Sequence, residues 1–357
     1  MTKSVNSNLK IALVNPRVES YSGTMPPLGL LYIAAVLEIN GFNVRVFDIS
    51  PNDDRDMAEV ISYSPDVIGI TILTDYFFRA KHICEIFKKE MPKAFLIIGG
   101  VHVTVMPKKS LIDFGADVGV VGEGEYTMLE LCNFLKQDAE WRCISGIVFK
   151  NKKGEIATIP RVHIDNLDGL PLPARHLLNF EEYLMPPGMI RGYWFERATT
   201  VMTSRGCPFS CIWCGSQCTF GKKVRYRSIS NIIIELESLI KKYAVDCVWF
   251  VDDTFTLKKD RVLEFCDQIQ KRKIKLAWGC QAHVKTADFE MFQKMKESGL
   301  VQLDFGVESG SNRVLNYLKK NSDVASIKMA FSLAKKSNIR TCATFMFGSP
   351  GEKKEDV

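Results

Sequence analysis

The stretch Met202-Thr-Ser-Arg-Gly-Cys-Pro-Phe-Ser-Cys-Ile-Trp-Cys-Gly215 carries three cysteines within eight residues and decides how the chain folds and what it binds. Cys207, Cys211 and Cys214 have the spacing Cys-x3-Cys-x2-Cys and directly follow an apolar stretch, residues 199–202, that is typical of a β-strand. Three thiolates on one short loop indicate one small inorganic centre. A cubane iron–sulfur cluster normally takes four cysteines, so three would leave one iron open to a substrate or cofactor.

Other kinds of site fit these cysteines less well. A structural zinc site usually has two cysteine pairs separated by a longer spacer, whereas here only Cys218 could serve as a nearby fourth ligand. A ferredoxin-type run has a narrower first gap and a proline after its last cysteine, but Pro208 follows the first cysteine of this run. A disulfide framework would require a secreted context, and the chain shows no secretory leader.

The spacing, together with the Arg-Gly-Cys-Pro that begins the run, resembles the motif of the radical S-adenosylmethionine (SAM) enzymes. This resemblance implies a [4Fe–4S] cluster ligated by Cys207, Cys211 and Cys214, with SAM bound at the open iron. Cys218 is then interpreted as a spare thiol near the cluster. The other cysteines are scattered and fit the role of small buried hydrophobic residues: Cys84, Cys132, Cys143, Cys247, Cys266, Cys280 and Cys342.

The composition fits a cytoplasmic enzyme. The 357 residues suffice for two domains, and the 46% hydrophobic and 25% charged residues are ordinary for a globular protein. Eleven cysteines without a leader indicate a reducing compartment, and no apolar run approaches the ~20 residues of a membrane span. The net charge of +6 comes from dispersed lysine pairs, so no nucleic-acid partner is expected.

The first third of the chain alternates apolar strand-like runs with helix-period stretches. Such continuous Val/Ile runs predict a Rossmann-like, doubly wound parallel sheet over residues 8–137, with ligands bound at the carboxyl ends of the strands. The predicted strands are residues 11–14, 44–47, 67–71, 94–98 and 118–121, and the predicted helices are residues 28–40, 56–62, 75–89 and 126–136.

Loops rich in glycine and small polar residues follow these strands. No Gly-x-Gly-x-x-Gly follows the first strand, which argues against a dinucleotide site. The set resembles instead the cobalamin-binding domain that precedes many radical SAM domains. The resemblance implies that the following residues contact cobalamin: Leu28, Gly29, Thr71, Thr74, Gly99, Gly100, His102, Gly122, Glu123 and Glu125.

The loop after the first strand departs from one cobalamin pattern. Domains that ligate cobalt through a protein imidazole carry Asp-x-His-x-x-Gly there, but residues 15–23 contain no histidine. We therefore expect no histidine on the lower face of cobalamin. His102, after the fourth strand, is expected to pack against the corrin edge or to cap a turn.

Residues 138–196 show no α/β alternation and are predicted to link the two domains. Residues 146–150 and 155–159, separated by Asn-Lys-Lys-Gly, predict a β-hairpin. Residues 167–175 are proline-punctuated and resemble the connector found between cobalamin and radical SAM domains.

A second α/β pattern runs over residues 197–357 and predicts a partial, TIM-like (β/α) barrel, whose chemistry lies on the loops at the carboxyl ends of the strands. Five strands are expected where radical SAM barrels usually have six, so we interpret the chain as truncated at its C-terminal end. The predicted strands are residues 199–203, 247–251, 276–280, 302–306 and 341–347, and the predicted helices are residues 229–243, 259–272, 288–298, 311–318 and 324–337.

The same resemblance implies SAM contacts on these barrel loops. Asp252 and Asp253, after the second strand, stand where the amino group of SAM is received, although one of them is also suited to cap the next helix. His283 stands where many relatives carry arginine, which puts that contact in doubt. The full set of implied SAM contacts is Phe209, Trp213, Gly215, Asp252, Asp253, Gln281, Glu308, Ser309 and Pro350.

Together these resemblances identify a cobalamin-binding radical SAM protein of the class B methyltransferase type. The family implies cleavage of SAM to a 5′-deoxyadenosyl radical and methylation of an unactivated carbon in a small-molecule, lipid or natural-product substrate. An electron donor such as flavodoxin or ferredoxin is implied as a partner.

Three alternatives remain open from the sequence. The first is a cobalamin-dependent radical cyclase or oxidative rearrangement enzyme. The second is a corrinoid- or cluster-binding fragment without turnover. The third, a tRNA-modifying methylthiotransferase, would carry cluster cysteines in the first domain, and these are not evident.

Overall fold

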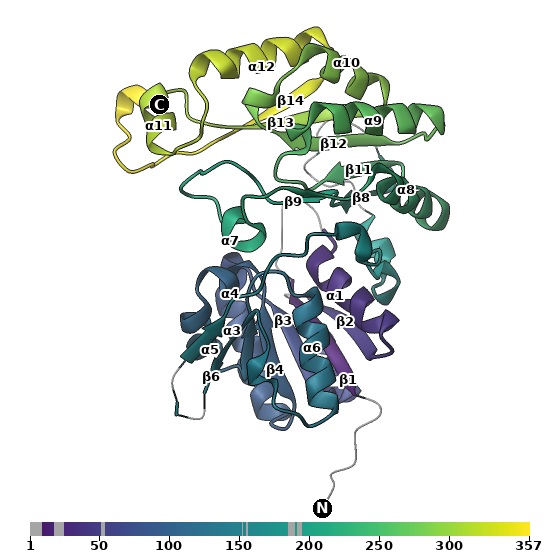
Figure 1. Cartoon of the computed structure of the whole chain (residues 1–357), viewed down its shortest axis with the longest axis vertical. Coiled ribbons are helices and arrows are strands. Elements are labelled where there is room, and N and C mark those ends of the chain that lie inside the picture. The colour runs from purple at the N-terminus through teal and green to yellow at the C-terminus, as the bar shows by residue number, and fades with distance from the viewer. Residues whose placement is uncertain are drawn as a thin grey trace, which may run out of the picture.

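The computed structural model describes residues 9–17, 25–50, 54–151, 153–154, 156–184, 190 and 195–357. Residues 18–24, which make up most of the histidine-free loop after the first strand, lie outside this range, as do residue 155 of the predicted hairpin and several residues of the predicted linker. Two α/β layers are visible in Figure 1, one at each end of the long axis, with the short helix α7 between them.

The first sheet is doubly wound, as predicted. Its first five strands are parallel in the order β2-β1-β3-β4-β5, so the strand order reverses between β1 and β3, where open sheets of this kind bind ligands. Their bounds are β1 Lys10–Pro16, β2 Asn43–Ile49, β3 Val67–Thr71, β4 Phe95–Gly99 and β5 Val118–Val120.

Helices cover both faces of this sheet. One face packs against α1 (Leu28–Ile39) and α6 (Glu125–Lys136), and the other against α2 (Asp54–Tyr63), α3 (Phe77–Glu90) and α5 (Pro107–Phe114). The sequence analysis predicted no helix between the fourth and fifth strands, yet α4 (Val101–Val105) and α5 occupy that segment. Each is short, because Pro107 starts a new helix directly after Met106, the residue that caps both α4 and α5.

The hairpin that the sequence analysis placed in the linker extends the first sheet. β6 (Ile147–Lys150) pairs antiparallel with β5, and β7 (Ile156–Ile159) pairs antiparallel with β6. The hairpin thereby covers the hydrogen-bonding edge of β5, which would otherwise be exposed.

The second sheet has five parallel strands in the order β14-β13-β12-β11-β8, which confirms the partial barrel. Their bounds are β8 Ala198–Val201, β11 Cys247–Phe250, β12 Ala277–Ala282, β13 Leu300–Glu308 and β14 Arg340–Phe345. The helices between them are α8 Ile229–Tyr243, α9 Lys259–Lys271, α10 Phe289–Glu297, α11 Asn312–Tyr317 and α12 Val324–Lys336.

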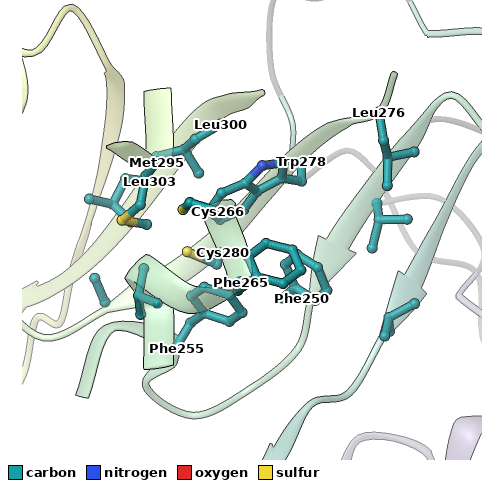
Figure 2. Close-up of a cluster of buried hydrophobic side chains, with 14 of the residues drawn as sticks. Phe250, Phe255, Phe265, Cys266, Leu276, Trp278, Cys280, Met295, Leu300 and Leu303 are labelled. Carbon is teal, nitrogen blue, oxygen red and sulfur yellow. The ribbon is translucent and has the colours of Figure 1, made fainter. Parts of the chain in front are cut away.

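The core of this domain is aromatic. Figure 2 shows Phe250, Phe255, Phe265 and Trp278 packed together. The Phe265 ring lies 5.4 Å from both Phe250 and Trp278 in near-perpendicular geometry, a favoured arrangement for aromatic pairs. The indole N–H of Trp278 donates to the Ser298 carbonyl at 3.1 Å. The loops at the carboxyl ends of these strands therefore start from a closely packed core.

Candidate functional site

The loop of the three cysteines begins at a two-stranded ribbon that follows β8. β9 (Ser204–Arg205) pairs antiparallel with β10 (Arg225–Tyr226), and the short helix α7 (Ser216–Phe220) lies between them in the chain. Gly206 has φ = +98°, and a Cβ there would lie 2.5 Å from the Lys223 carbonyl oxygen, so only glycine fits. The Cys207 N–H then donates to the Gly221 carbonyl at 3.2 Å.

The three cysteines of the motif lie on one loop with their thiols unpaired by disulfides. All three thiols are free; Cys207 and Cys211 are half-buried and Cys214 is exposed on the same loop. Burial raises the pKa of Cys207 and of Cys211, and the charge of Lys320 opposes that rise for Cys211. Among the described residues no three His, Cys, Asp or Glu side chains lie close enough to hold a single metal ion. A four-iron cluster accommodates thiolates that stand farther apart.

Cys218 lies on the exposed side of α7, one helical turn after the loop. Its N–H donates to the Gly215 carbonyl at 3.0 Å, which places the residue within the helix and apart from the loop that carries the other three thiols. This position fits the predicted spare thiol.

Asp252 and Asp253, expected at the amino group of SAM, both brace the cysteine loop. Asp252 is 1% exposed and accepts hydrogen bonds from the Thr203 N–H at 2.6 Å and from the Ser204 hydroxyl at 2.6 Å. Asp253 accepts from the Ser216 hydroxyl, and burial raises its pKa. Neither caps a helix in this structure, and Asp252 has its carboxylate oxygens engaged by the protein itself.

Phe209 and Trp213, on the cysteine loop, contact residues from two barrel loops. The Phe209 ring stacks on His283 with centroids 3.9 Å apart, and the His283 Nε2–H donates to the Lys320 carbonyl at 3.0 Å. Lys320 Nζ lies 5.5 Å from the Trp213 ring, within the range of a cation–π interaction. The Lys320 ammonium was not predicted as part of the site, whereas His283 was noted there as standing in place of the arginine of many relatives. Both residues link the cysteine loop to the barrel.

The remaining predicted SAM residues lie at strand ends of the same sheet. Gln281 is exposed on β12, and buried Ser309 follows β13. Pro350 is exposed in the turn after β14, where the Gly348 N–H donates to Glu352 Oε2 at 2.6 Å. Gly215 ends the cysteine loop and lies beside Val101 of α4.

A cavity of about 670 Å³ lies at the carboxyl edge of the first sheet and reaches the second domain. Eight of the ten predicted cobalamin residues line it: Leu28, Gly29, Thr71, Gly99, Gly100, Gly122, Glu123 and Glu125. Met202, Arg205, Thr219, Phe220 and Val251 close it from the barrel side. Gly100 has φ = +95°, and a Cβ there would lie 2.8 Å from the Ile72 carbonyl oxygen. The strand ends therefore line a hollow at the edge of the sheet where open α/β sheets bind ligands.

The other two predicted cobalamin residues, Thr74 and His102, contact each other away from the cavity wall. His102 Nδ1 lies 3.0 Å from the Thr74 hydroxyl, and its ring packs near Phe77 and Phe114 at centroid distances of 5.2 and 6.2 Å. Among the described residues lining the cavity there is neither histidine nor cysteine. His102, which the sequence analysis placed at the corrin edge or at a turn, is thus not among the described residues that line the cavity.

Glu123 and Glu125 are engaged in ion pairs across the two domains, which the sequence analysis did not predict. Arg205 pairs with both carboxylates, at 2.7 Å and 2.6 Å, and Arg225 pairs with Glu123 at 2.7 Å. All four side chains are at most 4% exposed. Arg205 was visible in the Arg-Gly-Cys-Pro quoted above, but its partners lie about eighty residues earlier in the chain.

Two family models match the chain. The model described as B12 binding domain matches residues 14–132, and the model described as Radical SAM superfamily matches residues 201–357. These matches cover the cavity-bearing sheet and the cysteine-bearing barrel, respectively.

Among curated proteins, the chain is 34% identical to the uncharacterized methyltransferase PH0819 of Pyrococcus horikoshii, covering 98% of this chain and 76% of that protein. It is 27% identical to the anaerobic magnesium-protoporphyrin IX monomethyl ester cyclase of Rubrivivax gelatinosus, covering 98% of this chain and 64% of the cyclase.

The same fold is found in a solved structure of the cobalamin-dependent SAM radical enzyme OxsB with aqua-cobalamin bound. The TM-score is 0.83 at 20% identity over 95% of this chain, and the match spans 49% of the OxsB chain.

Proposed function

The chain belongs to the cobalamin-dependent radical SAM enzymes, a family with methyltransferase members, and we propose that it methylates an unactivated carbon of a small-molecule or lipid substrate. The cofactors of this family are a [4Fe–4S] cluster, SAM and cobalamin. When bound, they supply a SAM-derived carbon radical and a transferable methyl group.

One observation carries the proposal: helix α7 borders both candidate cofactor sites. It starts one residue after Gly215 at the end of the cysteine loop, and its last two residues, Thr219 and Phe220, line the cavity. α7 also packs against α4 of the first domain. A methyl donor in the cavity and a radical source at the cysteine loop would therefore face the same small volume, as methyl transfer to a substrate radical requires.

The residues of the chain have distinct parts in this proposal. Cys207, Cys211 and Cys214 would ligate the cluster, while Asp252 and Asp253 hold the loop that presents these thiols. Gln281, Glu308, Ser309 and Pro350, at strand ends of the barrel, would bind SAM. The glycine-rich loops of the first sheet would receive cobalamin without a histidine ligand.

The test is anaerobic reconstitution of the full chain with iron, sulfide and hydroxocobalamin, followed by reduction in the presence of SAM labelled in its methyl group. We expect 5′-deoxyadenosine to form and label to appear in the corrinoid fraction even without substrate. Cys207→Ala should abolish 5′-deoxyadenosine formation and retain cobalamin. A chain that takes up neither cluster nor corrinoid would contradict the proposal.

A second candidate is a radical cyclase, because the curated relatives include the magnesium-protoporphyrin IX monomethyl ester cyclase. 5′-Deoxyadenosine formation with no label ever reaching the corrinoid or a product would favour the cyclase over the methyltransferase.

The partners and location are proposed from the chemistry of the family. A low-potential electron donor such as flavodoxin or ferredoxin would reduce the cluster, and the reducing cytoplasm would keep the thiols free. None of the helices in the described part of the chain combines the length and apolar composition of a bilayer-spanning segment.

A further inference from the structure

The two-stranded ribbon β9–β10 connects the two candidate cofactor sites. Arg205 on β9 lies opposite Arg225 on β10, and both guanidinium groups point to carboxylates at the junction of β5 and α6 in the first domain. In Figure 1, β9 lies at the face of the barrel domain that is turned toward the first domain.

The four charges of this junction are buried and balanced. Arg205 binds Glu123 and Glu125, and Arg225 binds both oxygens of Glu123 at 2.9 and 2.7 Å. Arg225 also donates to the Ile164 carbonyl at 2.6 Å. Because an unpaired buried charge is costly, each carboxylate fixes the position of the arginine that it binds.

Three of these four residues form part of the cavity wall. Arg205, Glu123 and Glu125 all line the cavity. The Arg205 guanidinium also lies 5.2 Å from the Tyr32 ring and 5.6 Å from the Phe220 ring, so aromatic contacts flank it on both domains. A corrinoid that fills the cavity would contact this group and restrict it further.

Arg205 is also close in the chain to the first cluster ligand. Only Gly206 separates it from Cys207, and at Gly206 a Cβ would lie 2.5 Å from the Lys223 carbonyl oxygen, so this turn is closely packed against the backbone of residue 223. A shift of Arg205 on β9 would therefore reach the backbone of Cys207 through this one residue.

We propose that Arg205 is a positioning residue that couples the cobalamin cavity to the cluster loop, so that occupation of either site strengthens binding at the other. The proposal rests on the proposed function, since it requires both cofactors to bind this chain. Thermodynamic linkage demands that the two effects be equal in size.

Arg175 offers a matched control. It is also a buried arginine, pairing with Glu235 of α8 at 2.6 Å and donating to the Thr200 carbonyl at 3.0 Å. It is not among the described residues that line the cavity, and it does not adjoin a cluster cysteine. Arg175→Gln should thus reproduce the loss of a buried ion pair without breaking the connection between the sites.

The first measurement is the cobalamin dissociation constant of the full chain with and without the reconstituted cluster. We expect the cluster to tighten cobalamin binding by about fivefold or more in the unsubstituted protein and in Arg175→Gln. In Arg205→Gln the two dissociation constants should agree within twofold. If Arg205→Gln does not fold, Glu125→Gln removes one of the two Arg205 pairs and serves for the same comparison.

The second measurement needs no cluster: amide hydrogen exchange of residues 203–214 with and without hydroxocobalamin. Cobalamin should slow exchange there in the unsubstituted protein and in Arg175→Gln, but not in Arg205→Gln. Coupling that persists in Arg205→Gln, or that is lost equally in Arg175→Gln, would overturn the role of Arg205.

Independent binding of both cofactors in the unsubstituted protein would overturn the coupling alone. A chain that takes up the cluster but no cobalamin would overturn the proposed function as well.

Discussion

The ammonium nitrogen of Lys320 lies 2.9 Å from Oε1 of Glu308, and both side chains are 10% exposed. Glu308 adopts φ = +67°, a backbone conformation that is uncommon outside glycine. A Cβ on Gly306 would lie 2.5 Å from Glu308 Oε1 and 2.7 Å from Lys320 Nζ, so this glycine leaves the room in which the pair forms. The pair fixes a residue that the sequence analysis assigned to SAM.

Removing one partner of this pair should be costly. Lys320→Met leaves the Glu308 carboxylate buried without its cation, and such changes destabilise by about 3–5 kcal/mol. Denaturant unfolding of the metal-free chain measures the loss. Lys222→Met is the control, because Lys222 is an exposed lysine that donates to the Ser210 hydroxyl at 3.0 Å. A loss below about 1 kcal/mol for Lys320→Met would be the size of a surface pair and would contradict the buried role.

The cluster assignment predicts a sharp difference among neighbouring cysteines. Alanine at Cys207, Cys211 or Cys214 should remove most of the iron taken up on anaerobic reconstitution and abolish SAM cleavage. Cys218→Ala should retain the iron content of the unsubstituted chain, because Cys218 lies on α7, outside the loop that carries the other three thiols. Iron and sulfide analysis of the four variants decides the matter. Equal iron loss in Cys218→Ala would instead indicate a four-cysteine site without an open iron.

The position of His102 away from the cavity predicts that it does not ligate cobalt. Paramagnetic resonance of the Co(II) form should show the same axial coordination in the unsubstituted protein and in His102→Ala. Nitrogen hyperfine splitting that disappears in His102→Ala would place this imidazole on the metal and refute the histidine-free site.

Burial lowers the pKa of His283 to about 4, so the folded protein favours the neutral ring. Unfolded chains bind a proton on histidine near pH 6.5. The folded state therefore loses stability as pH falls from about 6.5 toward 4, by up to about 3 kcal/mol. Above pH 6.5 the histidine has no such effect.

The measurement is the unfolding free energy of the metal-free chain between pH 4 and 7. His283→Gln should weaken the pH dependence relative to the unsubstituted protein, and His82→Gln, at an exposed position of α3, should not. Identical pH profiles for all three proteins would show that the His283 ring is not held neutral by its surroundings.

The sequence predicted the features that depend on local pattern. Continuous apolar runs marked β1 to β5, and their carboxyl-end loops proved to line a cavity in eight of ten assigned positions. The sequence did not predict which distant residues form ion pairs and hydrogen bonds with the site carboxylates, because tertiary packing brings these partners together. Glu123 lies 102 residues from Arg225, and Asp252 accepts from Thr203 over 49 residues. No local spacing in the sequence connects such pairs. Glu123 was therefore assigned to cobalamin and Asp252 to SAM, although their carboxylates bind an arginine and hydroxyl groups of the protein.

The close approach of Gly206 to the Lys223 carbonyl also bears on how the gene can vary. Every other amino acid would add a Cβ at a place that main-chain atoms already fill. In a saturation library of position 206 that is selected for iron uptake, only glycine should therefore be recovered. Codon 29 should be permissive to alanine, since a Cβ on Gly29 meets nothing within 4 Å. The residue that accompanies the first cysteine is thus constrained by the backbone of its own loop, independently of which substrate a given member of the family modifies.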